Sequence, residues 1–232
     1  MCLISQKRLS DCIFGTSRPL TGLSVIESLT SFPAALLLIG PTLLLLLAVT
    51  PGGIAERHPR TMGQLIQVVG LVSLTSSLVA ALITGFAEEA APSTLVVFGS
   101  HVGHFPLALS ARADSLSFTL MTLISLLAAI IARYSTSYLA GEATQGSFFR
   151  SLAFTVSAFM LVVIAGNMLM FVLAIGLTGS GLNRLLTHYR DRLPAQMVAH
   201  KKLLFSRMAD ASLLVAAVLI AVSEGTSSFE TL

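Results

Sequence analysis

The chain has no tryptophan, only two cysteines and very few charged residues. Of its 232 residues, 11% are charged and 54% are hydrophobic, whereas about 25% of the residues of a soluble domain are charged. The mean hydropathy is +0.86. This shortage of charge excludes a protein whose main solvent is water, and it indicates an integral membrane protein.

The few cysteines and histidines exclude several kinds of site. Cys2 and Cys12 both lie in the N-terminal tail, where they form neither a disulfide framework nor a metal site. His101 and His104 form an H-x-x-H pair, but no cysteine or acid stands at a spacing that completes a zinc site. The sequence contains no phosphate-binding glycine loop, nucleophile triad or haem motif. We therefore expect no metal, no cofactor and no enzymatic activity of the chain's own.

Long apolar segments dominate the sequence instead. A hydrocarbon core about 30 Å thick needs about 20 helical residues. Continuously apolar segments favour helices, which satisfy their own backbone hydrogen bonds in lipid. The predicted fold class is therefore all-α, a polytopic transmembrane helix bundle. About six segments approach the required length: 34–50, 63–86, 115–132, 151–166, 168–186 and 208–223.

The apolar pattern also predicts how the chain is organised. We expect three parts: a polar tail over 1–33, two spans with an outer loop over 34–110, and four spans over 111–232. In the outer loop, the apolar pieces LVVFG and FPLAL are too short to cross a membrane, so a hairpin or interfacial packing is expected. Asp114 follows this loop and is expected to cap the third span.

Basic residues are distributed unevenly between the two sides of the predicted bundle. With six spans, three loops share one side and carry ten of the fourteen basic residues: Arg57, Arg60, Arg133, Arg150, Arg184, Arg190, Arg192, Lys201, Lys202 and Arg207. By the positive-inside rule these basic loops are cytoplasmic, and both termini are periplasmic. The isoelectric point of about 9.2 then reflects topology, and nucleic acid is not an expected partner.

Ionisable residues inside a span are functional candidates, because burying charge in hydrocarbon is costly. The centres of the six predicted spans carry essentially none. The nearest lie at span edges: Arg184, Lys201, Lys202, Arg207 and Asp210. Arg207 and Asp210 are three residues apart and are expected to pair at the mouth of the sixth span. Topology and snorkelling toward the interface are the alternative roles of these residues.

The fifth predicted span is rich in small residues. Gly176, Gly179, Ser180 and Gly181 surround Thr178. Small residues permit close contact between helices, and hydroxyls can hydrogen-bond across it. Two interpretations stay open: packing alone, or a thin, polar-lined helix beside a hydrated path. Hydroxyl groups orient water but do not release protons near neutral pH.

The run ADSLSFTLMTLISLLAAIIARYSTSYLAGEATQGSFFRSLAFTVSAFMLVVIAGNMLMF is similar to part of a known superfamily. It resembles the N-terminal half of the proton-conducting membrane subunits of respiratory complex I and Mrp antiporters. The D-S-L-S opening, the Y-S-x-x-Y-L-x-G connection and the G-N-x-L hinge carry this resemblance. Those subunits usually have a glutamate in the fifth span, in a W-E-G-x-G-L context, and Thr178 occupies the matching position here.

Thr178, followed by LLTHYRDRLPAQMVAHKKLLFSRMAD, resembles the DabB branch, the membrane subunits of a bacterial inorganic carbon pump, over residues 112–225. The resemblance implies a bacterial inner-membrane protein that anchors DabA, a zinc-binding partner similar to β-carbonic anhydrases. The pair accumulates bicarbonate, driven by a cation gradient, expected to be protons, and the zinc chemistry belongs to the partner. The implied coupling residues are Lys201, Lys202, Arg207 and Asp210, with Thr178 lining the path.

The chain departs from this branch in two ways. Asn183 stands where DabB-like sequences have a histidine, and Ile175 stands where a tryptophan is common. Related subunits also continue through many more helices, so the sequence is expected to be either a fragment or one of two chains, the second of which supplies those helices. Two alternatives stay open: a proton-translocating subunit of NADH-quinone oxidoreductase or of an Mrp-type antiporter, and an inactive truncated fragment. The missing glutamate argues against the first.

Overall fold

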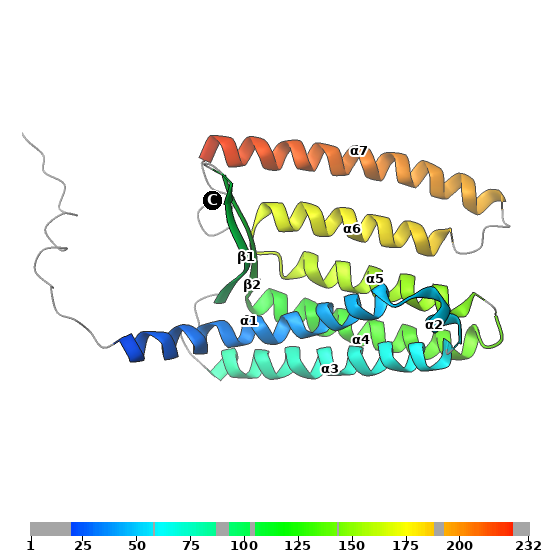
Figure 1. The fold of residues 1–232 in the computed structure, drawn as a ribbon, viewed down its shortest axis with the longest axis horizontal. Helices are drawn as coiled ribbons and strands as arrows, with labels where there is room; N and C mark the ends of the chain where they lie inside the picture. Colours follow the sequence, from blue (N-terminus) through cyan, green and yellow to red (C-terminus); the bar gives the residue numbers. More distant parts are fainter. Residues whose placement is uncertain are drawn as a thin grey trace, which may run out of the picture. The chain divides into compact units, whose positions relative to one another are not determined.

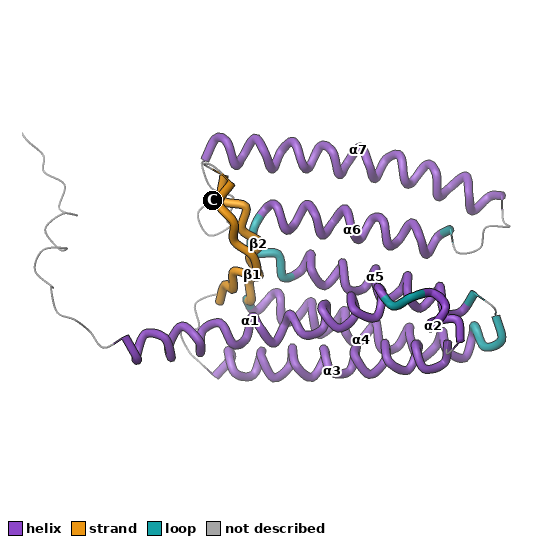
Figure 2. The backbone as a smooth tube through the Cα atoms, viewed as in Figure 1, coloured by secondary structure: helices purple, strands orange, loops and turns teal. Residues whose placement is uncertain are grey.

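A computed structural model describes residues 20–57, 59–86, 93–102, 105–142, 144–187 and 193–224. The elements follow one another as α1 (Leu20–Val49), α2 (Gly52–Arg57), α3 (Pro59–Phe86), β1 (Ser93–Val102), β2 (Phe105–Ala113), α4 (Ser115–Tyr138), α5 (Gln145–Val163), α6 (Met168–Leu186) and α7 (Leu193–Glu224). Figure 1 shows the helices and Figure 2 the hairpin that β1 and β2 form. The predicted helical class is confirmed, and this hairpin is the exception among the described elements.

The chain divides into two compact units, Met1–Thr30 and Ser31–Leu232. The described part of the first unit is the beginning of α1. The second unit holds the rest of that helix and all the other described elements.

Five described helices are long and apolar enough to cross a membrane: Pro59–Ile83, Ser115–Tyr138, Gln145–Val163, Met168–Leu186 and His200–Ser223. The apolar part of α1, Ala35–Val49, is shorter. Together they correspond to the predicted spans, which confirms a transmembrane bundle of about six helices. The predicted start of the last span, at position 208, is wrong: α7 already begins at Leu193. Charged residues interrupt the apolar run there, but a helix carries them on its surface without ending.

The hairpin forms in the loop where a hairpin or interfacial packing is predicted. β1 and β2 pair in antiparallel register from Ser93 opposite Ala113 to Val102 opposite Phe105. In Figure 2 the hairpin lies at one end of the helices of the second unit. Its apolar segments therefore pair with each other at this end and do not cross the membrane.

The second strand of the hairpin is joined to the connection between α5 and α6. The amide of Arg112 donates to the carbonyl oxygen of Ile164 at 2.9 Å, and the amide of Gly166 donates to that of Ser110 at 2.7 Å. A Cβ at Gly166 would lie 2.8 Å from the same Ser110 oxygen, so glycine permits this close approach. These bonds hold the N-terminal end of α6 next to the hairpin.

The core lies among α1, α3, α4 and α5, where both apolar and hydroxyl side chains are buried. Ser125 Oγ on α4 donates to Ser73 Oγ on α3 at 2.9 Å, and Ser157 Oγ on α5 donates to the Pro41 carbonyl on α1 at 2.8 Å. Such hydroxyls join helices where no water reaches them. The largest fully buried apolar side chains are Leu37, Leu44, Ile66, Met121, Phe149, Met160 and Ile164.

Gly40 tests the packing of α1 on α3. A Cβ at Gly40 would collide with the side chain of Ser73, whereas a Cβ at Gly53 would meet nothing within 4 Å. We expect Gly40→Val to lower the unfolding temperature of the detergent-solubilised protein, because overpacking costs about 1–3 kcal/mol. Gly53→Val is the matched control and should unfold close to the unchanged protein. Equal unfolding temperatures for the two variants would contradict this packing.

Candidate functional site

The contact between α6 and α7 joins small residues on one helix to polar residues on the other. A Cβ at Gly176 would lie 4.0 Å from Asp210 Oδ2, and a Cβ at Gly179 would lie 2.9 Å from Ser206 Oγ. Gly176 and Gly179 share one helical face, and so do Ser206 and Asp210. The two pairs show that α6 and α7 pack antiparallel. The glycines leave room for the polar side chains of α7.

Three charged side chains of α7 converge on this contact. Lys202 Nζ donates to the Gly179 carbonyl oxygen at 2.9 Å. Arg207 Nη2 donates to Ser180 Oγ at 3.3 Å, while its Nη1 lies 3.7 Å from Asp210 Oδ2. The side chain of Asp210 is 19% exposed and that of Arg207 is 60% exposed, so the carboxylate is the better covered partner. The predicted pairing of Arg207 with Asp210 is present.

Asp210 lies in the middle of its span. It is the eleventh of the 24 residues in the apolar part of α7, His200–Ser223. Gly176, which faces it, is the ninth of the 19 residues of α6. With a rise of about 1.5 Å per residue, both positions are near the middle of their candidate spans. The prediction that the span centres carry essentially no ionisable residue is therefore wrong, because the last span starts earlier than predicted.

Asp210 is the sole acidic residue within the candidate spans of the described part of the chain. An ionised carboxylate inside hydrocarbon is costly unless it is paired. Here its partner Arg207 lies on the same helix and Lys202 reaches the neighbouring turn of α6. This arrangement makes the α6–α7 contact the strongest functional candidate among the described residues.

Two of the predicted candidates are placed differently. Thr178 Oγ1 donates to the Ala174 carbonyl oxygen of its own helix at 2.8 Å. At about 100° per residue, Thr178 is rotated away from the face that carries Gly176 and Ser180. Lys201 is exposed, whereas Lys202 next to it reaches α6. The structure thus brings together Lys202, Arg207 and Asp210 of the predicted set.

Ser206 is a site residue that the sequence interpretation missed. It lies four residues after Lys202 and four before Asp210, so the three share one face of α7. This spacing was a usable signal once α7 was known to be helical before position 208. The pairing of Ser206 with Gly179 shows that the polar face of α7 is continuous along the contact.

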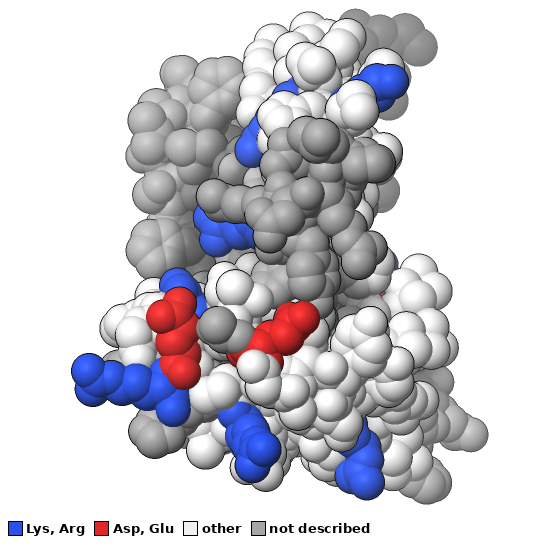
Figure 3. Space-filling model, turned by 90° about the vertical axis from the view of Figure 1, so that its right-hand side faces the viewer, with Lys and Arg blue, Asp and Glu red and all other residues white. Residues whose placement is uncertain are grey.

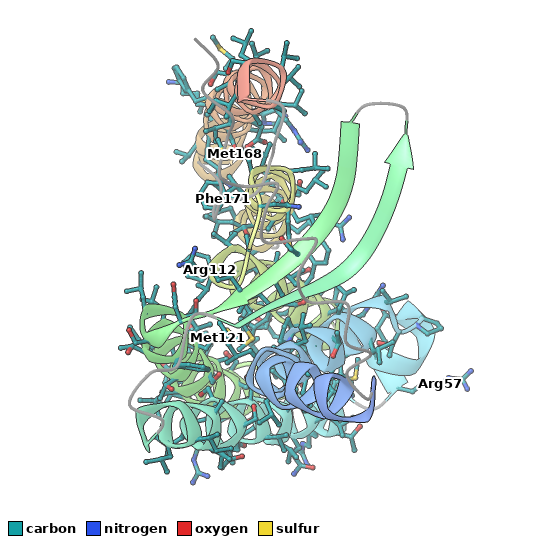
Figure 4. The ribbon with its side chains drawn as sticks, turned by 90° about the vertical axis from the view of Figure 1, so that its left-hand side faces the viewer. Arg57, Arg112, Met121, Met168 and Phe171 are labelled. Carbon is teal, nitrogen blue, oxygen red and sulfur yellow. The ribbon has the colours of Figure 1, made fainter. Side chains whose placement is uncertain are left out.

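At the end of the bundle where the hairpin lies, a second group of polar side chains stabilises the start of α4. Asp114 caps α4, as predicted, by accepting from the Ser117 amide at 2.8 Å. Its other carboxylate oxygen lies 3.6 Å from Arg112 Nε. Figure 4 shows Arg112 at the base of the hairpin, where the strands meet the helices. Of the two predicted histidines, His101 lies on β1, and His104 lies outside the described residues.

The opposite end of the second unit is basic. Figure 3 shows Lys and Arg side chains around a few acidic ones on this face. The end is formed by α2, the starts of α3, α5 and α7, and the ends of α4 and α6 (Figure 1). Its exposed cations are Arg57, Arg60, Arg133, Arg184 and Lys201, and its exposed acids are Glu56 and Glu142. Figure 4 shows Arg57 pointing away from the helices.

Sequence comparison finds similarity to membrane transport subunits. Residues 100–149 match the family described as the N-terminus of NADH-ubiquinone oxidoreductase (complex I) chain 5. The "probable inorganic carbon transporter subunit DabB2" of Halothiobacillus neapolitanus is 42% identical over 195 residues, which are 84% of this chain and 35% of that protein. The "probable inorganic carbon transporter subunit DabB" of Hydrogenovibrio crunogenus is 32% identical over 114 residues, 49% of this chain and 22% of that protein.

A solved structure has the same fold. A chain of the membrane-bound sulfane sulfur reductase, an archaeal respiratory membrane complex, superposes with a TM-score of 0.64 over 86% of this chain and 38% of that chain. The sequence identity is 13%, so this likeness concerns the fold alone. This chain spans about a third of the length of DabB2, and less of DabB. In sequence the chain is similar to the DabB subunits of these two bacteria, and in helical fold it is similar to a chain of a membrane respiratory complex.

Proposed function

We propose that the chain is the membrane subunit of an energy-coupled pump for inorganic carbon, and that it contributes a proton path along the α6–α7 contact. The substrate class, CO2 or bicarbonate, rests on the names of the two relatives. The coupling role rests on one observation: the carboxylate of Asp210 lies at mid-span, against Gly176, in the part of the chain that otherwise has no acid within its described spans.

Asp210 can do what Thr178 cannot. A carboxylate takes up and releases protons, whereas a hydroxyl does not release one near neutral pH. Arg207, at 3.7 Å, supplies the opposite charge when the carboxylate is ionised. In this proposal, a proton carried by Asp210 removes this attraction and leaves the guanidinium of Arg207 its contact with Ser180.

The basic end of the second unit is the proposed cytoplasmic face, with both termini on the periplasmic side. Basic loops remain on the cytoplasmic side of bacterial membranes. In this proposal a DabA-like partner docks at that end and carries the zinc chemistry that interconverts CO2 and bicarbonate. The exposed arginines of this end, such as Arg57 and Arg60, favour a partner surface with acidic side chains.

A second candidate function is proton translocation in a respiratory or antiporter complex. The match of residues 100–149 to complex I chain 5 favours it. The two candidates differ in their partners: a quinone-reducing complex would co-purify with the chain in the second case, and a carbonic-anhydrase-like protein in the first. Purification from native membranes, followed by identification of the bound proteins, separates them.

The first prediction of the pump proposal concerns uptake. We expect Asp210→Asn and Lys202→Gln to reduce uptake of labelled bicarbonate at least about tenfold, because each removes a charge from the α6–α7 contact. Lys201→Gln is the matched control and should retain uptake, because Lys201 is exposed. The chain is expressed with its DabA-like partner in a host without carbonic anhydrase, and a second strain adds the remaining segment of DabB2. Full uptake by Asp210→Asn would contradict the proposed path.

A second prediction concerns the ion pair. Arg207→Met leaves Asp210 without its partner, so it should destabilise the protein more in the presence of Asp210 than in the Asp210→Asn background. We expect a coupling on the order of 1 kcal/mol, because Arg207 is largely exposed. Chemical unfolding of the two single variants and the double variant in detergent measures it. Strictly additive effects would show that the pair contributes nothing.

A further inference from the structure

Asn183 has a buried polar atom without a partner. Its Oδ1 is buried and makes no hydrogen bond. Asn183 follows Gly176, Gly179 and Ser180 by seven, four and three residues, which places it on the same face of α6, the one that meets α7. An unpaired buried amide oxygen costs free energy. A donor within reach along this face would relieve that cost.

The register of the two helices brings Lys202 to this position. Gly176 faces Asp210 and Gly179 faces Ser206, so one further turn along both antiparallel helices brings position 183 opposite position 202. An ammonium group has three donors, and the Gly179 carbonyl oxygen takes one of those of Lys202. The flexible lysine stem allows the ammonium to move along α6.

The neighbouring cations are placed elsewhere. The guanidinium of Arg184 lies 5.2 Å from the centre of the Phe154 ring on α5, and Lys201 is exposed. Arg207 is engaged with Ser180 and Asp210. Among the described residues, Lys202 is therefore the cation that the register brings to Asn183.

We propose that Asn183 Oδ1 is a second acceptor for the Lys202 ammonium, which moves between the Gly179 carbonyl and Asn183. Position 183 follows position 179 by one helical turn of α6. Gly179 is the acceptor nearer Asp210, and Asn183 the one nearer the basic end. The ammonium would thus carry positive charge toward and away from Asp210, with Asn183 acting as a positioning residue.

The role in transport rests on the proposed function. A positive charge attracts a carboxylate, so the approach of Lys202 to Gly179 strengthens the positive surroundings of Asp210. Its withdrawal to Asn183 weakens them. Movement of one side chain between these two acceptors then links the surroundings of Asp210 to the basic end of the bundle, without a second acid among the described residues of the α6–α7 contact.

Unfolding measurements test the Asn183–Lys202 pair without any transport. We expect Asn183→Asp to raise the unfolding temperature by a few degrees in the protein with Lys202, because the new carboxylate pairs with the ammonium. In the Lys202→Met background the same change should lower it, because the carboxylate is left unpaired. In the Lys201→Met background, the matched control, Asn183→Asp should still raise it. The same shift in the Lys202 and Lys202→Met backgrounds overturns the proposal.

If the double variant Asn183→Asp with Lys202→Met fails to fold, Asn183→Leu gives the same cycle without a buried charge. The change in unfolding temperature that Asn183→Leu causes should differ between the Lys202 and Lys202→Met backgrounds.

Uptake of bicarbonate then tests the positioning role. Asn183→Asp should lower bicarbonate uptake about tenfold by holding Lys202 away from Gly179. The conservative variant Asn183→Gln should keep most of the uptake of the unchanged chain. Coupling in the unfolding cycle with full uptake by Asn183→Asp overturns the positioning role. If the unchanged complex shows no uptake, the proposed function fails, and the unfolding cycle still tests the pair.

Discussion

The cost of placing a charge in hydrocarbon constrains this structure more than any other factor. Asp210 lies near the centre of its span, and such a position is kept only where pairing or function compensates for lost hydration. The structure supplies the pairing through Arg207 on the same helix. The glycines of α6 supply the space. Removing the counter-charge of Arg207 would leave the carboxylate unpaired. Replacing the glycines with larger residues would exclude it from the contact.

The rest of the bundle makes this contact possible. Buried hydroxyls and glycines hold α1, α3, α4 and α5 close together, as the bond between Ser125 and Ser73 shows. The hairpin is bonded to the connection before α6 through Gly166, which fixes where α6 begins. α6 is thereby held on one side by α5, where a Cβ at Gly181 would lie 2.6 Å from Thr155 Oγ1. Its other side is free to receive the polar face of α7.

The sequence was sufficient for the fold class, because long apolar runs have few structures available to them in lipid. The hairpin and the Asp114 cap were also predictable, because both depend on local spacing. The α6–α7 contact was not. A hydropathy profile ends the predicted span at charged residues such as Lys202, Arg207 and Asp210. A membrane helix can nevertheless carry these residues on one face where glycines of the neighbouring helix leave room for them. Which face of α6 meets α7 depends on packing, and this is why the sequence alone did not show that Thr178 lies off this face or that Ser206 faces it.

The central claim is that Asp210 carries protons at mid-span, and proton movement across a sealed membrane tests it most directly. The complex is reconstituted into vesicles that contain a pH-sensitive dye, and a membrane potential is imposed. The account predicts a change of internal pH with the unchanged chain, a slower change with Asp210→Glu and none above background with Asp210→Asn. An undiminished pH change with Asp210→Asn would contradict it.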